Sequence, residues 1–502
     1  IWALEVPVAP HPERALRGTL ERVDDEALRA RLTAPLDELE AARDAVAAAA
    51  GDDSALDQAL ADLETRFTRL TGKRPTHLEG ATYAGRTLVY EDCRRDIEMT
   101  LGPEFSERLG PPLFLLLQSA RWFTYRTGER FLAQLERLFA EFQRKTGAKT
   151  VDFAPLKYRA LAAEPALYAT VRELQARWAE IFAVEDDARS VEFTFAELRD
   201  RVAAAFSAPH PGFPFGRYHS PDIMIDAESV EAIRRGNYRL VLGELHAGII
   251  SLLQTIFVLT HPSPGDVIAT HKCDVPGPQV YPVMPRSYGR GYRLAPDSYA
   301  DEDLHLVMDD TPSWRPPDRV LRIADLVVEK ADGQLFVRTR DGAKRFHIIE
   351  VFHFHLRGWC SLNFSLLPPA AHQPRVRIDG LVVARESWRI PCRDLAFAWE
   401  KREPARFIGA RRWAAARDLP RWVFARFPQE RKPVYVDLES PACVELMAKL
   451  ARRAGAETEN ALISVSEMLP TPEQAWLIDA EGRRYTSELR IVAVDPISWR
   501  RP

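Results

Sequence analysis

Apolar positions in the first part of the chain recur at the spacing of an α-helix. Leu56, Leu60, Leu63, Phe67 and Leu70 follow one another at intervals of four and three positions, which places them on one helical face. The same spacing occurs within residues 36–46, and a turn signal at residues 51–54 separates the two runs. We predict a helical hairpin within residues 12–70 that packs as core; the alternative is a coiled coil that binds a partner.

The hydrophobic pattern changes near residue 209, where loops rich in proline and glycine and short apolar runs replace the helical period. Before that point, further helices are predicted at residues 112–144, 165–184 and 195–206. After it, a β-hairpin is predicted at residues 322–329 and 335–339 around a turn at 331–334. Further elements are expected as strands at 376–383 and 434–438, a helix at 441–454, and a final strand pair at 475–479 and 488–494.

These elements predict an α+β fold in which a helix-rich N-terminal part is followed by mixed, sheet-containing regions. We expect a helix-rich region with an arginine-rich motif at 1–205, a mixed α/β central region at 206–372, and a basic, tryptophan-rich α/β region at 373–502. The length of 502 residues allows roughly two to four packed units. A composition that is 46% hydrophobic and 28% charged excludes a disordered chain.

The sequence gives few signals of location. The longest apolar stretch, residues 247–259, is interrupted by Ser251, Gln254 and Thr255 and is shorter than the about 20 residues of a membrane-spanning helix. The first five residues contain neither an initiator methionine nor the basic start of a signal peptide. Five cysteines without a C-x-x-C pair suit a reducing compartment. We therefore expect a cytoplasmic protein with no membrane span.

Charge is unevenly distributed along a chain whose formal net charge is −4. Between Arg375 and Lys432, 15 Arg or Lys stand against seven Asp or Glu, so this segment alone is strongly basic. Four tryptophans lie among these arginines, and guanidinium groups and aromatic rings together suit single-stranded RNA. The candidate RNA-binding residues are Arg385, Arg389, Arg402, Arg406, Arg411 and Arg412.

Two alternatives for the basic segment remain open. The tryptophans can form a core from which the arginines extend outward to solvent. The preference for arginine over lysine can also reflect a GC-rich genome and carry no function.

The densest group of charged side chains near glycines lies at residues 80–96. Arg86, Arg94 and Arg95 can clamp a phosphate or carboxylate group, and Asp92 can orient them or handle a proton. The alternative is a cluster of surface ion pairs that caps the next helix.

A second candidate site lies just before the longest apolar run. Glu244 and His246 are two residues apart, and a carboxylate beside an imidazole can act in general acid–base chemistry because imidazole titrates near neutral pH. The alternative is a histidine that only satisfies hydrogen bonds at the end of a strand.

Two groups of side chains could bind a metal ion, but neither is favoured as a metal site. His353 and His355 alternate on a predicted strand and share parity with His347, which could form a three-histidine face, although no carboxylate accompanies them. An acidic stretch around His305 could bind a hard cation, but its spacing matches no EF-hand, and a solvated acidic loop is the alternative. It contains Asp297, Asp301, Glu302, Asp303, Asp309 and Asp310. Motifs for serine hydrolases, phosphate loops, dinucleotide folds and zinc proteases are missing.

Several segments, taken in order, resemble the N-terminal, tRNA-dependent domain of lantibiotic dehydratases. They are GATYAGRTLVYEDCRRD at 80–96, IADLVVEKADGQLFVRTR at 323–340, PRVRIDGLVVARESWRI at 374–390, and the C-terminal pieces KPVYVDL, SEMLP and DAEGRRYTSELR. Their order and spacing agree with the family over most of the chain.

The resemblance implies a transfer of an amino acid, usually glutamate, from aminoacyl-tRNA to Ser or Thr hydroxyls of a ribosomally made precursor peptide. A separate elimination domain then removes the glutamate. Stand-alone relatives divide into split glutamylation enzymes and peptide aminoacyl-tRNA ligases, which form an amide bond. The chemistry needs no protein nucleophile, because the aminoacyl ester is already activated and has only to be aligned with the peptide.

By resemblance, Arg86, Asp92, Arg94 and Arg95 lie near the aminoacyl end, with Glu244 and His246 as further catalytic candidates and the basic segment as the tRNA-binding surface. We expect no cofactor besides aminoacyl-tRNA as co-substrate and no metal. The expected partners are the precursor peptide, a separate elimination-domain protein and a second copy in a homodimer. The family's basic N-terminal motif has no counterpart before residue 80, so the alternative is a non-catalytic scaffold subunit that binds tRNA or the leader peptide.

Overall fold

The computed structural model describes residues 12–76, 87–89, 95, 97–184, 188–283, 300–311, 313, 315–430, 432–458 and 461–499. The chain divides into two compact units, each made of several segments. The first contains Ile1–Glu98, Leu135–Leu161 and Leu252–Phe354, and the second contains Met99–Gln134, Ala162–Ser251 and His355–Pro502. Each unit contains residues from more than one of the three predicted regions, 1–205, 206–372 and 373–502. These three regions stay a prediction.

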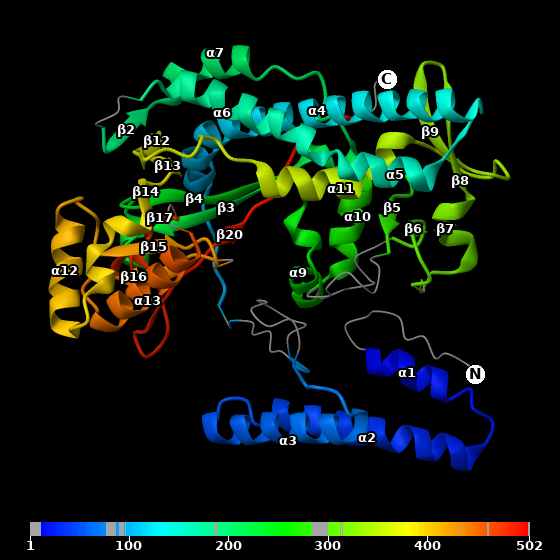
Figure 1. The fold of residues 1–502 in the computed structure, drawn as a ribbon, viewed down its shortest axis with the longest axis horizontal. Helices are drawn as coiled ribbons and strands as arrows, with labels where there is room; N and C mark the ends of the chain where they lie inside the picture. Colours follow the sequence, from blue (N-terminus) through cyan, green and yellow to red (C-terminus); the bar gives the residue numbers. More distant parts are fainter. Residues whose placement is uncertain are drawn as a thin grey trace. The chain divides into compact units, whose positions relative to one another are not determined.

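The predicted helical hairpin is confirmed in the first unit. Helix α1 is Pro12–Leu20, α2 is Glu26–Ala48 and α3 is Asp53–Thr71 (Figure 1). The side chains of Asp25 and Asp52 accept hydrogen bonds from the first-turn backbones of α2 and α3, which satisfies amide groups that have no partner within the helix. Helix α3 ends at Gly72, whose positive φ of 65° glycine adopts without steric cost.

The first unit also contains two small sheets and short helices. Strands β1 (Val151–Asp152), β8 (Leu326–Ala331), β9 (Gln334–Thr339) and β10 (Arg345–His347) pair antiparallel in this order. Strands β5 (Val280–Pro282), β6 (Leu304–Val307) and β7 (Val320–Arg322) pair parallel. The short helices are α5 (Phe153–Ala162), α9 (Thr255–Thr260) and α10 (Pro264–Asp274). The β8–β9 pair confirms the predicted hairpin, and its turn at Asp332 and Gly333 has positive φ at both residues.

In the described part of the second unit, seven strands form one mixed sheet. Its order is β2 (Ser190–Phe193), β12 (Arg375–Ile378), β13 (Leu381–Ala384), β4 (Arg239–Ala247), β3 (Tyr218–Asp226) and β20 (Leu489–Arg490), with β21 (Ala493–Val494) also paired to β3. The predicted strand at 376–383 is wrong: Asp379 and Gly380, both at positive φ, turn the chain between β12 and β13. This Asp-Gly pair is a strong hairpin signal in the sequence.

The second unit contains two of the predicted helices and the C-terminal strands. Helices α6 (Tyr168–Phe182) and α7 (Phe195–Ala205) confirm the predictions at 165–184 and 195–206. The predicted final pair is wrong, because β18 (Leu477–Ile478) pairs with β19 (Arg484–Tyr485), whereas residues 489–494 pair with β3. Helices α4 (Pro103–Thr146) and α11 (Ile348–Asn363) contribute residues to both units.

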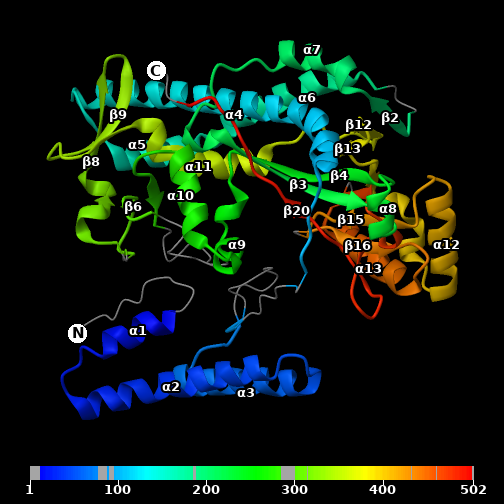
Figure 2. The same cartoon turned by 180° about the vertical axis from the view of Figure 1, so that it is seen from behind.

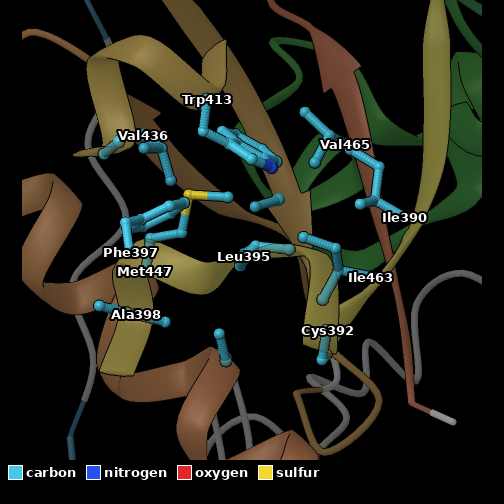
Figure 3. Close-up of a cluster of buried hydrophobic side chains, with 14 of the residues drawn as sticks. Ile390, Cys392, Leu395, Phe397, Ala398, Trp413, Val436, Met447, Ile463 and Val465 are labelled. Carbon is cyan, nitrogen blue, oxygen red and sulfur yellow. The ribbon is translucent and has the colours of Figure 1, made fainter. Parts of the chain in front are cut away.

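A second sheet in this unit has strand order β11 (His372–Gln373), β14 (Ser387–Pro391), β17 (Leu462–Glu467), β15 (Trp422–Arg426) and β16 (Val434–Asp437). Alternate residues of each strand are buried, as expected for a sheet covered on one face. The buried side chains form a cluster with helices α12 (Glu403–Ala415) and α13 (Pro441–Glu457). Figure 3 shows this core, in which Trp413 and Met447 lie with Ile463 and Val465 of β17.

Candidate functional site

The candidate site lies on the seven-stranded sheet, where β3 and β4 depart from regular pairing. Pro221 pairs with Leu245 and Ile223 pairs with Leu242, so Asp222 faces two residues of β4 instead of one. A β-bulge of this kind redirects side chains and often lies beside functional groups. A Cβ at Gly243 would stand only 3.2 Å from the Met224 Cε and 3.3 Å from the Asp222 Cβ, so a larger residue here would require these neighbours to shift by a few tenths of an ångström.

Strand β20 lies beside β3 (Figure 2). The bulge brings Asp222 next to His246, and β20 supplies Arg490 to the same carboxylate. His246 Nε2 lies 3.1 Å from Asp222 Oδ2, and Arg490 Nη1 forms an ion pair with that same oxygen at 2.7 Å. On its other side, His246 Nδ1 lies 3.2 Å from the hydroxyl of Ser361 on α11. The imidazole is therefore held at both ring nitrogens, which fixes its orientation.

Two further carboxylates complete this cluster. Glu488 Oε1 forms an ion pair with Arg490 Nη2 at 2.8 Å, and Glu244 Oε2 lies 3.6 Å from His246 Nε2. The Asp222 side chain is 4% exposed and that of His246 is 18% exposed, whereas that of Glu244 is 79% exposed. The cluster thus runs from a buried carboxylate, through a partly buried imidazole, to a carboxylate in solvent.

The electrostatics follow from this arrangement. The hydrogen bond with Asp222 raises the pKa of His246 above its ordinary value of 6.5, although burial alone would lower it. Burial raises the pKa of the Glu488 carboxyl, and the nearby negative charge of Asp222 adds to this effect against the opposing charge of Arg490. The imidazole is therefore held by a carboxylate that favours its protonated form, an arrangement suited to a general acid or base.

Arg385 lies beside the bulge and not on an exposed surface. Its guanidinium donates to the backbone carbonyl oxygens of Leu242 and Leu469, each at 3.0 Å. Burial lowers the pKa of Arg385, while the charges of Glu488 and Glu244 act in the opposite direction. The Arg385 side chain is therefore bound to the backbone at the start of the bulge. Its guanidinium group is not placed to reach a nucleic-acid backbone.

The other predicted RNA-binding arginines differ in what they contact. Arg406 is paired with Glu445 at 2.6 Å, and Arg411 is paired with Glu439 at 2.8 Å. Arg389, Arg402 and Arg412 are exposed, and none of them has an ion-pair partner among the described residues. RNA binding by the six arginines stays a prediction, but only these last three hold their guanidinium groups available to an added anion.

The structure brings together Glu244 and His246 of the predicted catalytic residues. Arg86, Asp92 and Arg94 lie outside the described residues, while Arg95 is described and exposed. Sequence reasoning missed Asp222, Ser361, Glu488 and Arg490. These positions are separated from His246 by up to 244 residues, so spacing could not reveal them; a proline and an aspartate within β3 and a glycine within β4 are the local signals.

The predicted strand that carries His353 and His355 is wrong, because both residues lie in helix α11. Residues two apart on a helix point in very different directions, so the two imidazoles do not form the proposed metal face. The acidic stretch is largely solvated, as expected, since Asp301, Glu302, Asp309 and Asp310 are exposed. Asp303 is the exception among its described acids, because it is buried and accepts hydrogen bonds from Gln279, Ala300 and Lys272. In the described part of the chain, no three or more His, Cys, Asp or Glu side chains are grouped to hold a metal ion.

The fold is that of the glutamylation domains of lantibiotic dehydratases, which confirms the predicted α+β, lantibiotic-dehydratase-like fold class. The glutamylation domain TbtB from thiomuracin biosynthesis aligns over 96% of this chain and 61% of its own, with 18% identity and a TM-score of 0.55. The same domain bound to 5′-phosphodesmethylglutamycin aligns over 92% and 58%, with 17% identity and a TM-score of 0.54.

A third solved structure belongs to a longer protein. The tRNA-dependent lantibiotic dehydratase MibB from Microbispora sp. 107891 aligns over 93% of this chain and 46% of its own, with 16% identity and a TM-score of 0.59. The chain thus spans between about half and three fifths of the length of these proteins. No family model and no curated protein matches the sequence. Among the described helices, none is both long and apolar enough to cross a bilayer.

Proposed function

We propose that the chain transfers an amino acid from an aminoacyl-tRNA to a ribosomally synthesised precursor peptide. The likeness to TbtB and MibB over more than nine tenths of the chain carries this proposal. One of these proteins is named for glutamylation in thiomuracin biosynthesis and the other for dependence on tRNA. The resembling segments support the same activity, with glutamate as the amino acid in the dehydratase case.

In this reaction the peptide nucleophile attacks the carbonyl carbon of the aminoacyl ester. A new ester or amide bond forms, the bond to the tRNA ribose oxygen breaks, and the proton lost by the nucleophile ends on that oxygen. His246 is suited to relay this proton, because both of its ring nitrogens have hydrogen-bond partners and Asp222 raises its pKa. Glu244 is exposed beside it and can receive the incoming peptide amine or hydroxyl.

The remaining catalytic assignments rest on the resemblance. Arg86, Arg94 and Arg95 would clamp the terminal phosphate or a substrate carboxylate, and Asp92 would share the proton transfer with His246. Aminoacyl-tRNA is the co-substrate, and no other cofactor is proposed. The proposed partners are the precursor peptide, a separate elimination-domain protein and a second copy of the chain.

The test is a transfer assay with the full chain. Total tRNA is charged with a mixture of labelled amino acids and incubated with the peptide encoded beside the gene, and label in ribonuclease-resistant peptide is counted. We expect label to move to the peptide, and His246→Gln to slow the transfer by roughly 100-fold, the usual contribution of a general acid–base group.

His261→Gln is the matched control, because His261 is an exposed histidine of the first unit and should leave the rate unchanged. Binding of tRNA without any transfer would contradict the enzyme proposal and favour the scaffold subunit. Transfer at the same rate in the His246 variant would leave the reaction standing but remove His246 from it.

A further inference from the structure

The five-stranded sheet of the second unit has one face that its helices leave open. The register places Arg389 of β14 and Arg426 of β15 on either side of Ser464 in the strand between them. The next row on the same face contains Ser466, Phe424 and Tyr435. Directly opposed side chains lie on one face of a sheet, so these six residues define what we call the open face.

The other face of the same sheet is fully covered. Trp388 and Ile390 of β14, Val423 of β15, and Ile463 and Val465 of β17 are buried in the core shared with α12 and α13 (Figure 3). On the open face, by contrast, Arg389, Arg426, Ser464 and Tyr435 are exposed. One face of the sheet is therefore buried in the core, and the open face is accessible to a ligand.

The open face is positive. Neither Arg389 nor Arg426 has an ion-pair partner among the described residues, unlike Arg421 close by, which donates to both carboxylate oxygens of Asp437 at 3.0 and 2.8 Å. Two strand spacings of about 4.8 Å each separate the two free arginines. Two guanidinium groups at that separation, with a serine hydroxyl between them, favour an anion with more than one charged group.

The open face also carries aromatic rings. The rings of Phe424 and Tyr435 have centroids 6.5 Å apart at an interplanar angle of 67°, and the Tyr435 ring reaches solvent. The nearby ring of Trp422 is already covered by the guanidinium of Arg421, at 4.9 Å. Exposed rings beside unpaired arginines on a sheet are the combination that binds unstacked bases together with their phosphates.

We propose that the open face binds single-stranded RNA, namely the acceptor end of a tRNA, with Arg389 and Arg426 on phosphates and Tyr435 on a base. This inference rests on the proposed function and gives its tRNA a specific contact surface. It retains Arg389 of the six arginines predicted from the sequence and adds Arg426. Arg412 lies on helix α12, which packs on the covered face, and Arg402 directly precedes that helix.

The test measures binding of the full chain to deacylated total tRNA and to a short single-stranded RNA ending in CCA, across a salt series. The double variant Arg389→Gln/Arg426→Gln should bind both probes roughly tenfold or more weakly at low salt. The slope of log affinity against log salt should fall by about 1.4, since each lost phosphate contact on a single strand removes about 0.7. The matched control is Arg172→Gln, an exposed arginine of helix α6 in the same unit, which should bind like the unmodified chain. Arg412→Gln tests the helical face, because Arg412 is exposed on the opposite side of the layer.

A second pair of variants tests the base contact. Tyr435→Leu keeps an apolar side chain but removes the ring, and should weaken binding of the single-stranded RNA roughly fivefold or more. Tyr435→Phe keeps the ring and should restore binding. All of these positions are exposed. A thermal unfolding transition at the same temperature as that of the unmodified chain shows that each variant folds.

The outcomes separate this inference from the proposed function. If the unmodified chain binds tRNA and the double variant binds equally well, the open face is not the contact and the proposed function stands. If Arg412→Gln weakens binding as much as the double variant, the helical face is the contact instead. If polyglutamate competes with the RNA while Tyr435→Leu has no effect, the face binds an acidic peptide, and if no RNA binds at all, both proposals fail.

Discussion

Replacing Asp222 with asparagine should change how stability depends on pH, because Asp222 holds the charge that favours protonated His246. The carboxylate oxygen lies 3.1 Å from His246 Nε2 and its side chain is 4% exposed. Asparagine has the same shape but no charge. It would leave His246 facing Arg490, whose Nη1 is only 3.4 Å from the same ring nitrogen.

The magnitude can be worked from these contacts. An opposite charge at this range shifts a pKa by about one to three units, and partial exposure of the imidazole favours the lower end. One unit corresponds to about 1.4 kcal/mol between the two protonation states. The variant should also lose the ion pair with Arg490, which costs about 1.5 to 3 kcal/mol at any pH, although Glu488 remains paired with that arginine.

The sign of the pH dependence follows from the raised pKa. His246 has a higher pKa in the folded chain than its ordinary 6.5, so its pairing with Asp222 stabilises the fold fully below pH 6.5. That stabilisation is lost as the pH rises through the folded pKa. The destabilisation caused by Asp222→Asn should therefore be about 1.4 kcal/mol larger near pH 6 than near pH 9.

Urea unfolding followed by tryptophan fluorescence at both pH values measures this difference. Glu244 and Glu488 face the same site, but they are present in both proteins and cancel in the comparison. The control is Asp222→Asn made in a His246→Gln background, where the effect should be equal at both pH values. Equal destabilisation at the two pH values in the single variant would refute the assigned charge pairing.

Three further substitutions test the packing of the second unit by thermal or urea unfolding. Glu386→Gln should cost about 1.5 kcal/mol, because the buried carboxylate loses its charge-assisted hydrogen bonds from Arg189 at 2.8 and 2.9 Å, while the partly exposed Arg189 keeps Asp418 as a partner; an unchanged stability would mean that solvent replaces the carboxylate. Met447→Ala should cost about 2 to 5 kcal/mol through a cavity in the core of Figure 3, and a loss below about 1 kcal/mol would indicate that the core collapses around it. Gly212→Ala should cost roughly 2 kcal/mol or more, since φ is +87° and the new Cβ would stand 2.6 Å from the Thr124 carbonyl oxygen; a tolerated alanine would contradict the close approach.

Local sequence patterns predicted the elements whose cause is local. The apolar period of residues 56–70 fixed the face of α3, and the Asp-Gly turn fixed the β8–β9 hairpin. The error at β12 and β13 arose because a second Asp-Gly pair, at Asp379 and Gly380, was read as part of one apolar strand.

The placement of His353 and His355 in a helix, and not in the predicted strand, also has a local signal in the sequence. Ile348, Ile349, Phe352, His353, Leu356, Trp359 and Cys360 are all buried. Their spacing of three and four residues is the period of a helix and not of a strand. The alternation of two histidines over three residues was too short a pattern to outweigh it.

The candidate site could be predicted only in part, because its geometry depends on strand register. Glu244 and His246 are neighbours in the sequence, whereas Asp222 and Arg490 reach them only through the pairing of β3 with β4 and β20. A shift of that register by one residue would send Asp222 to the opposite face of the sheet. No periodicity in a single sequence determines which strands pair or where a bulge falls.

Even so, three residue types that are unfavourable in a β-sheet coincide at the site. Pro221 lacks the amide hydrogen that a central strand donates, Gly243 weakens the strand opposite, and Asp222 places a carboxylate in a buried position. Each of these costs stability in a regular sheet, and all three meet across one pair of strands. Such local conflicts are expected where a fold gives up stability for chemistry. The stretches SPDIMID and LGELHAG, each an apolar run interrupted by these residues, therefore locate the site better than any charged cluster in the sequence does.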